Sequence, residues 1–216
     1  MSDQTLQEHV AEEIHWDPKV DAKAIAVSAK DGIVTLRGSV GSFHQKREAT
    51  KAAERVRGVV EVDNQLEVQI MTDQRRADAD LRADVLQVLM LDALVPVSVD
   101  ATVREGIVTL DGAVEQQYQR DEAMYVAGNV PGVVAIENQI QLIPSMPDAP
   151  DIQHSIKKAF ERDAKVEAER LDVETSPGTV TLKGNVRSVY ERDAAVAAAW
   201  AAPGVRQVDD QLNVIS

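Results

Sequence analysis

The chain contains an internal repeat, and this repeat limits the possible folds more than any other feature of the sequence. Residues 32–40 read GIVTLRGSV, and closely similar segments recur at residues 106–114 (GIVTLDGAV) and 178–186 (GTVTLKGNV). The three segments therefore begin at nearly equal intervals along the chain. Self-similarity at a nearly fixed spacing indicates that one structural unit is repeated.

A second repeated segment lies in step with the first. Residues 58–66 read GVVEVDNQL and recur as GVVAIENQI at 132–140 and as GVRQVDDQL at 204–212, at the same offset from the first segment in every copy. We therefore expect three homologous domains, comprising residues 1–71, 72–146 and 147–216. A unit of about 70 residues buries only about 60% of the surface of its unfolded chain. The three domains are therefore expected to pack on one another for mutual support.

Each copy shows a helical pattern followed by two strand patterns. The first helix has apolar residues four apart, as at Leu6, Val10 and Ile14, and similar patterns cover residues 78–91 and 151–160. Alternating apolar residues then predict two strands joined by a tight turn. The turn dipeptides Asp31-Gly32 and Glu105-Gly106 favour type I′, whereas Pro177-Gly178 favours type II.

A second, alanine-rich helix and a third strand complete each copy. The helix is predicted over residues 42–57, 115–129 and 187–202, and its small inward residues allow a close approach to the sheet. Because this helix forms the crossover between strands two and three, these strands should be parallel. The predicted fold class is α+β: three tandem α-β-β-α-β units, each a three-stranded mixed sheet covered on one face by two helices.

Two sets of glycines recur in all three copies, and both have structural interpretations. The glycines that follow the second helix are Gly58, Gly132 and Gly204. We expect them to end that helix as C′ residues. The glycines inside the second strand are Gly38, Gly112 and Gly184. We expect them to mark a bulge or a close backbone approach where the second helix crosses the sheet.

The charge and cysteine content exclude several classes of function. The chain has 23 Lys and Arg against 36 Asp and Glu, a net charge of −13, so bulk electrostatics do not favour nucleic-acid binding. The same excess opposes adsorption to an anionic membrane unless one face concentrates the positive charge. With no cysteine there is no disulfide, thiol nucleophile, iron–sulfur cluster or cysteine-ligated zinc.

The repeated residues resemble a known family. Three features are similar to the BON domain (bacterial OsmY and nodulation), present in three tandem copies: the pattern Gly-x-Val-Thr-Leu-x-Gly, an alanine-rich helix, and a Gly-Val segment that contains Asn64 or Asn138. The third copy departs at Arg206 and Asp210. The resemblance implies binding rather than catalysis. It also implies association with phospholipid surfaces or other envelope components, often in osmotic or general stress proteins.

The start and the hydropathy of the sequence give an expectation about location. The first residues have neither a basic nor an apolar region of the kind found in a signal peptide, which OsmY-like members of the family carry. No apolar run approaches the roughly 18 residues that would predict a transmembrane helix. We therefore expect a cytoplasmic protein, and a periplasmic one only if the N-terminus has been trimmed.

The sequence offers no motif for catalysis or for a cofactor. The four histidines do not form a metal-ligand motif with a counterpart in another copy, and the glycines of the repeat lie in strands rather than in a phosphate-binding loop. We expect no catalytic residue, no metal site and no cofactor. An unrecognised hydrolase is the alternative, and it would require a pocket of convergent carboxylates or histidines.

Two groups of basic residues are candidate contacts with an anionic surface. Arg47, Lys51 and Arg55 are spaced four apart, which predicts a basic stripe on the exposed face of the second helix of the first domain. Lys157 and Lys158 lie on the first helix of the third domain. Each basic residue near an anionic membrane contributes about 1 kcal/mol, so such binding would be weak and salt-sensitive. The competing interpretation of the stripe is a solvated face balanced by neighbouring glutamates.

The most apolar stretch and the two tryptophans also have two interpretations each. Residues 90–97 (MLDALVPV) are expected to be buried at a domain interface, with a lipid-inserting loop as the alternative. Trp16 and Trp200 are expected to cover the edge of a core, with interfacial anchoring as the alternative.

Two classes of function follow from these features. The leading hypothesis is a non-enzymatic, stress-associated binding or scaffold protein with weak affinity for anionic phospholipid headgroups. The alternative is a protein–protein scaffold without lipid affinity, in which a partner's strand pairs with an exposed sheet edge. The residues leave the protein partner and the oligomeric state open.

Overall fold

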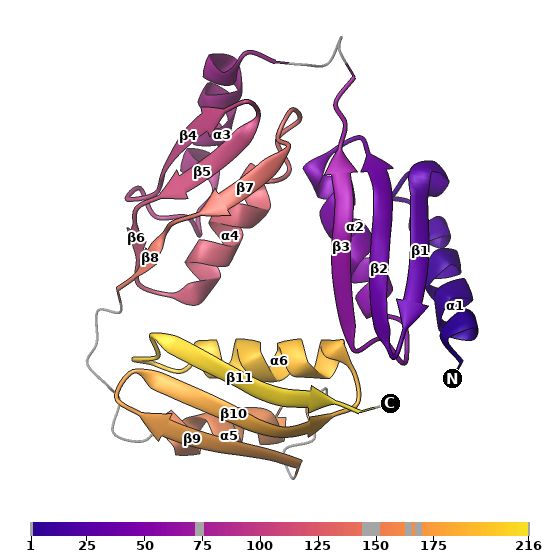
Figure 1. The fold of residues 1–216 in the computed structure, drawn as a ribbon. Helices are drawn as coiled ribbons and strands as arrows, with labels where there is room; N and C mark the ends of the chain where they lie inside the picture. The colour runs from indigo at the N-terminus through magenta and orange to yellow at the C-terminus, as the bar shows by residue number, and fades with distance from the viewer. Residues whose placement is uncertain (1, 72–75, 144–151, 163–165, 167–169, 216) are drawn as a thin grey trace.

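The chain forms three α-β-β-α-β domains, as the repeat predicts. The computed structural model describes residues 2–71, 76–143, 152–162, 166 and 170–215. In each domain two helices cover one face of a small mixed sheet (Figure 1). The predicted α+β class and unit order are therefore confirmed. The predicted boundary between the second and third domains falls outside the described residues.

The first domain shows the basic topology. Its elements are α1 (Asp3–Trp16), the 3₁₀ turn η1 (Ala22–Ala24), β1 (Ile25–Lys30), β2 (Ile33–Val40), α2 (Phe43–Glu54) and β3 (Glu61–Val68). The strand order is β1-β2-β3; β1 pairs antiparallel with β2, and β2 pairs parallel with β3. The register places Gly38 opposite Ile25 on one side and beside Leu66 on the other. The crossover through α2 thus makes the last two strands parallel, as predicted.

The second and third domains repeat this topology with one difference. The second contains α3 (Asp78–Leu91), β4 (Asp100–Arg104), β5 (Ile107–Asp111), β6 (Ala113–Val114), α4 (Gln117–Ala127), β7 (Ala135–Asn138) and β8 (Gln141–Leu142). The third contains α5 (Ile152–Arg162), β9 (Leu171–Ser176), β10 (Thr179–Val186), α6 (Val189–Trp200) and β11 (Gln207–Val214). In the second domain the sheet is interrupted, so β5 pairs parallel with β7 and β6 pairs parallel with β8.

The hairpin turns follow their dipeptides. Asp31 and Gly32 both have positive φ (52° and 82°), as a type I′ turn requires, and Glu105 and Gly106 also both have positive φ. In the third hairpin only Gly178 has positive φ, which fits the predicted type II turn. In the second domain, hydrogen bonds connect the start of the first helix to the hairpin turn at Glu105-Gly106. The Asp78 carboxylate accepts the N–H groups of Glu105 and Gly106 at 2.8 and 3.0 Å.

The strand glycines do mark a close backbone approach, but the predicted partner was wrong. Gly38, Gly112 and Gly184 have φ of 117°, 125° and 132°. A Cβ atom at each of these glycines would overlap a backbone carbonyl oxygen in the segment that enters the first strand. This oxygen belongs to Ala24 in the first domain and to Ser98 in the second. The glycines therefore let the chain entering the first strand cross the second strand closely. The glycines do not make room for the second helix.

The second helices are shorter than predicted, and the glycines after them do not act as C′ residues. Helix α2 ends at Glu54, before the predicted end at residue 57, and Gly58 follows in a separate turn. That turn is closed by the Val59 N–H, which donates to the Val56 carbonyl oxygen at 3.2 Å, and Gly58 has positive φ in it. The dipeptides Pro131-Gly132 and Pro203-Gly204 occupy the corresponding turns. These glycines therefore shape the turn into the last strand.

The domains pack on one another, with the second helices toward the middle of the molecule (Figure 1). Phe43, the first residue of α2, packs against the hydrophobic core of the second domain. Val189, the first residue of α6, is only 1% exposed and belongs to the core cluster of the first domain. Val214 at the end of β11 also packs against that cluster. The expectation that the domains pack together is thus confirmed.

Candidate functional site

The predicted basic stripe does not form a free face, because Arg47 lies in the junction between the first two domains. Its guanidinium donates to the Asn129 Oδ1 atom at 2.7 Å and to the Tyr125 carbonyl oxygen at 3.2 Å. The same group lies over the Tyr125 ring, 4.4 Å from the centroid. The side chain is only 19% exposed. Arg47 therefore connects α2 to α4, and its predicted exposure was wrong.

Lys51, one turn further along α2, lies beside the same tyrosine but is bound to a carboxylate. Its Nζ atom is 5.6 Å from the Tyr125 ring centroid and 3.3 Å from the Glu48 Oε1 atom. Glu48 is buried and also accepts a hydrogen bond from Lys19 at 2.9 Å. Burial alone would raise the pKa of Glu48, but the hydrogen bonds from Lys19 and Lys51 lower it below its ordinary value. This buried carboxylate therefore stays charged and holds two lysines.

Arg55 follows α2 as its C-cap residue, so it is not in the helix as predicted. Its guanidinium donates to the Asp17 Oδ2 atom at 2.8 Å and to the Glu13 Oε1 atom at 3.0 Å. The hydrogen bond from Arg55, and then the Lys19 backbone N–H, lower the pKa of Asp17. The three basic residues predicted as one anion contact are thus all bound by protein groups, and Arg47 and Lys51 share two of them, Tyr125 and Glu48.

Helices α2 and α4 enclose a groove of about 520 Å³. The apolar part of its lining comes from Phe43, Met124 and Tyr125, and the cations are Lys46, Arg47 and Lys51. Glu54 and Asp121 also line it. A second cavity of about 390 Å³ lies between α2 and α6 and is lined by Lys51, Glu54, Arg55, Tyr190, Asp193 and Ala194. The inner face of α2 thus contributes to both cavities.

Nothing in the sequence places Phe43, Tyr125 or Asn129 at a junction between domains. Tyr125 occupies the same position of the second copy as Lys51 does of the first, so it lies on the outward face of its helix. An aromatic residue on an outward helix face could have indicated a contact with another domain. The spacing does not indicate which domain it meets.

The second group of predicted contacts, Lys157 and Lys158, is exposed on α5. The Lys157 Nζ atom is 4.0 Å from the Asp172 Oδ1 atom, at the limit of an ion pair. A role of these lysines in binding an anionic surface stays a prediction.

The apolar stretch of residues 90–97 is not buried at a domain interface, so that expectation was wrong. Met90, Leu91, Leu94 and Val97 are 76%, 73%, 51% and 101% exposed. Val95 faces the core instead, which anchors the segment. We call the four exposed side chains the apolar tip of the second domain.

The local backbone explains how the tip is shaped. Helix α3 ends because Asp92 adopts an extended conformation, and its carboxylate then accepts the Leu94 N–H at 2.8 Å. In the first domain Lys19 occupies the position that corresponds to Leu94, and it forms an ion pair with Glu48 of α2. The second domain therefore has an exposed aliphatic side chain where the first has a paired cation.

The two tryptophans have different environments. Trp16, the last residue of α1, is 81% exposed, so the expectation that it covers a core edge was wrong. Trp200, the last residue of α6, is partly buried and packs against the core of the third domain, as expected.

Two features, a metal-binding cluster and a membrane-spanning helix, are absent from the described residues. Within the parts of the chain that the structure describes, no three histidine or carboxylate side chains lie close enough together to hold a metal ion. None of the described helices is long and apolar enough to cross a membrane. His44 takes part in the junction of the first two domains, where its Nδ1 atom is 3.0 Å from the Asn129 Oδ1 atom.

The fold and its interfaces define a class of three-domain proteins in which one helix-and-sheet unit is used three times. The chain matches the BON domain family over residues 2–70, 77–144 and 148–216, and it belongs to that family. It is 30% identical over 148 residues to the osmotically-inducible protein Y of Escherichia coli (strain K12), an alignment that covers 65% of this chain and 73% of the relative.

Two solved structures of one secretion protein also align with the chain. The first is of CdsD, a structural protein of the type III secretion system of Chlamydia trachomatis, at 15% identity over 98% of this chain and 92% of that chain, with a TM-score of 0.27. The second is of the C-terminal domain of CdsD, at 12% identity over 100% of both chains, with a TM-score of 0.28.

Proposed function

We propose that this chain is a non-enzymatic, stress-associated binding protein that attaches to phospholipid surfaces through the apolar tip of its second domain. Membership of the BON family and the similarity to an osmotically inducible protein support the stress association. The observation that carries the attachment is the exposure of Met90, Leu91, Leu94 and Val97 on one segment. Exposed clusters of large aliphatic side chains mark protein or membrane contacts.

The energetics favour insertion of this tip rather than electrostatic adsorption. Full burial of one such side chain contributes about 1.5–3 kcal/mol, so partial burial of four gives a reversible affinity. Residues 72–146 contain 5 basic and 12 acidic residues, which opposes attraction to anionic lipid. The attachment should therefore depend little on salt. Arg47, Lys51 and Arg55 contribute less than an exposed stripe would, because protein groups already bind them.

Lys157 and Lys158 provide a second, electrostatic contribution in this proposal. Both side chains are exposed, and each basic residue near an anionic membrane is worth about 1 kcal/mol. Screening by salt weakens such a contribution, because the Debye length falls from about 10 Å at 0.1 M to about 3 Å at 1 M. Salt therefore separates the two modes of attachment.

The test is co-sedimentation of the full chain with phosphatidylglycerol/phosphatidylethanolamine vesicles at 50 mM and 500 mM NaCl. We expect binding at both salt concentrations and at least a fivefold loss for the variant Met90→Ser/Leu91→Ser/Val97→Ser. The matched control, Trp16→Ser/Ile33→Ser, removes exposed apolar groups from the first domain and should bind as the original chain does. A third variant, Lys157→Glu/Lys158→Glu, should bind more weakly than the original chain at 50 mM NaCl and equally well at 500 mM, because salt screens the contribution of the lysines.

Two results would overturn the proposal. One is binding by the tip variant equal to that of the control at both salt concentrations. The other is that the original chain, shown by a cooperative thermal melt to be folded, sediments with no vesicle at either salt concentration.

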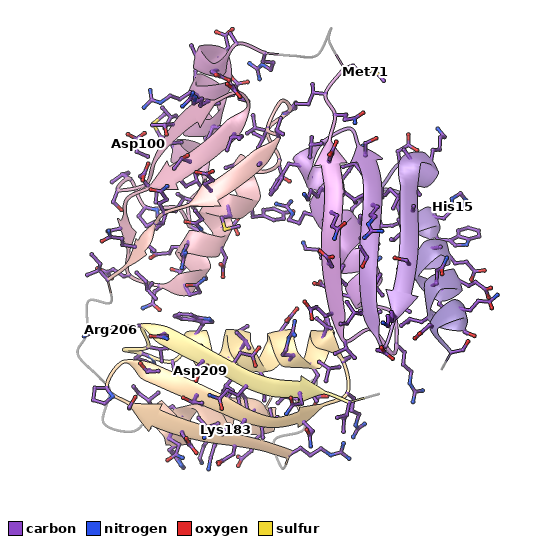
Figure 2. The ribbon with its side chains drawn as sticks, viewed as in Figure 1. His15, Met71, Asp100, Lys183, Arg206 and Asp209 are labelled. Carbon is purple, nitrogen blue, oxygen red and sulfur yellow. The ribbon has the colours of Figure 1, made fainter. Side chains whose placement is uncertain are left out.

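A protein–protein scaffold is the second candidate, and the open sheets favour it. The strand order leaves β9 and β11 at the edges of the third sheet, where another strand could pair with their outer backbone groups. Figure 2 shows Lys183 and Asp209 on the side of this sheet that the helices leave uncovered. The acidic second domain would suit a basic partner. A folded original chain that binds no vesicle would favour this alternative.

A further inference from the structure

We propose that the groove between α2 and α4 binds a long-chain fatty acid, with the carboxylate among the cations of α2 and the alkyl chain along Phe43, Met124 and Tyr125. The groove belongs to the junction of the first two domains, and the apolar tip contributes nothing to its lining. Its volume of about 520 Å³ lies within the range of about 300–1,000 Å³ found for small-molecule sites. The proposal does not depend on attachment to membranes.

The apolar wall of the groove is held in place by the packing of the domains. The Phe43 ring leans on α4 where Gly128 lacks a side chain; a Cβ atom there would lie 2.9 Å from the ring. Met124 packs partly against the core of the second domain. The Tyr125 side chain is partly exposed, and the Arg47 guanidinium covers one face of its ring. A flexible alkyl chain thus meets a preformed surface with three large apolar groups.

The three cations of the groove differ in how far protein groups already bind them. Lys46 forms no ion pair with the described residues, although its backbone carbonyl oxygen accepts a hydrogen bond from Asn64 at 2.9 Å. The Arg47 Nε atom is buried and has no hydrogen-bond acceptor, since the carboxylate oxygen of Glu48 is 3.8 Å away. Lys51 shares its partner Glu48 with Lys19. Lys46 is therefore the cation most available to a ligand carboxylate.

Two protein carboxylates also line the groove and select against a purely charged ligand. Burial raises the pKa of both Glu54 and Asp121 above their ordinary values, and the charge of Asp193 adds to the effect at Glu54. Since Arg47 and Lys51 lie beside the charged Glu48, Lys46 is left to face two carboxylates whose charged forms burial disfavours. A small anion such as acetate gains little here, whereas an anion with an alkyl chain gains from the apolar wall.

The test is isothermal titration of the full chain with dodecanoate below its micelle concentration. We expect saturable binding of one dodecanoate, with at least tenfold weaker binding by Met124→Trp, which fills the groove, and about threefold weaker binding by Lys46→Gln. Acetate tests the need for the alkyl chain and dodecanol tests the need for the charge; both should bind at least tenfold more weakly. The matched control, Met71→Trp, changes an exposed methionine outside both the groove and the apolar tip and should bind dodecanoate normally.

The outcomes separate this site from the proposed membrane attachment. Normal dodecanoate binding by the folded Met124→Trp variant, or equal binding of dodecanol, would overturn the fatty-acid site. Loss of dodecanoate binding in the tip variant Met90→Ser/Leu91→Ser/Val97→Ser would also overturn it, because the ligand would then occupy the apolar tip. Vesicle attachment that survives in Met124→Trp leaves the proposed function intact whatever happens to the groove.

Discussion

The junction between domains one and two and the junction between domains three and one use the same positions of the second helix with different side chains. At the first position, Phe43 packs against the core of the second domain and Val189 is buried in the core of the first. One turn later along α2 and α6, the two junctions have residues of opposite charge. Arg47 donates to Asn129, just after α4, whereas the corresponding Asp193 lies in a cavity with Glu54.

This difference shows which part of a junction comes from the repeat and which part does not. The apolar first residue places one domain against the next in both cases. The residue one turn later adjusts the chemistry: one junction gains a cation with hydrogen bonds and a ring contact, and the other gains two neighbouring carboxylates. One unit can therefore be reused with interfaces that respond differently to pH and to substitution.

The largest expected effect is that of removing the apolar residue that both junctions share. Phe→Ala in a core costs about 3–5 kcal/mol, and because Phe43 is only partly buried we expect Phe43→Ala to lower the free energy of unfolding by about 2 kcal/mol. Val189→Ala should cost about 1.5 kcal/mol, at roughly 0.8 kcal/mol for each buried methylene.

Urea unfolding of the full chain measures both costs. The control is Ser28→Ala on the exposed face of β1, because surface substitutions of this kind usually change the free energy of unfolding by less than about 0.5 kcal/mol. Costs for Phe43→Ala and Val189→Ala no larger than that of the control would show that these contacts do not support the domains.

A middle-sized effect is expected from the cation of the first junction. Arg47→Ala removes the hydrogen bonds to Tyr125 and Asn129 and the contact with the Tyr125 ring, together worth about 1–2 kcal/mol. A double-mutant cycle with Asn129→Ala, followed by urea unfolding, should give a coupling of about 1 kcal/mol. Strictly additive losses would contradict a direct interaction across the junction.

The smallest effect concerns the carboxylates of the other junction and depends on pH. Burial raises the pKa of Glu54 above 4.5 and that of Asp193 above 3.8, although the charge of Arg192 opposes both shifts. The folded chain therefore binds protons more tightly than the unfolded chain. The stability that this protonation contributes is greatest below the ordinary values and is lost as the pH rises through the raised ones.

Glu54→Gln should remove part of the stability loss that the original chain shows as the pH rises. We expect the variant to be more stable than the original chain at pH 8 by less than about 1 kcal/mol, because interactions between partly exposed charges are weak. The difference in the free energy of unfolding should shrink toward pH 4. Thermal melts at several pH values measure it, with Glu61→Gln on the exposed side of β3 as the control. A larger advantage at pH 4 than at pH 8 would reverse the sign and refute the prediction.

Most of the fold could be predicted because the repeat shows the same local chemistry three times. The periodicity of Leu6, Val10 and Ile14 indicates a buried helix face, and all three are in the core. The hairpin dipeptides specify their turns because only particular backbone conformations close them. The strand glycines were correctly interpreted as close approaches, but a linear pattern does not say which backbone segment comes close.

The candidate site could be predicted only in part, because it is assembled from different domains. The spacing of Arg47, Lys51 and Arg55 places the first two on one side of α2, yet it carries no information that Tyr125 covers that side. The apolar run of residues 90–97 normally indicates burial, and the sequence does not show that Val95 turns inward while its aliphatic neighbours face outward. Contacts between domains depend on surfaces that a single helix pattern does not describe.

The crossing at Gly38, Gly112 and Gly184 has a consequence for how such chains can diverge. Any side chain there would strike a carbonyl oxygen, and the backbone already has a conformation that other residues rarely adopt. Drift can exchange charged and aliphatic residues in loops, as between Lys19 and Leu94, but these three positions have almost no freedom to vary. In a chain too altered for its helices to be compared, the number of such glycines would still give the number of repeated units.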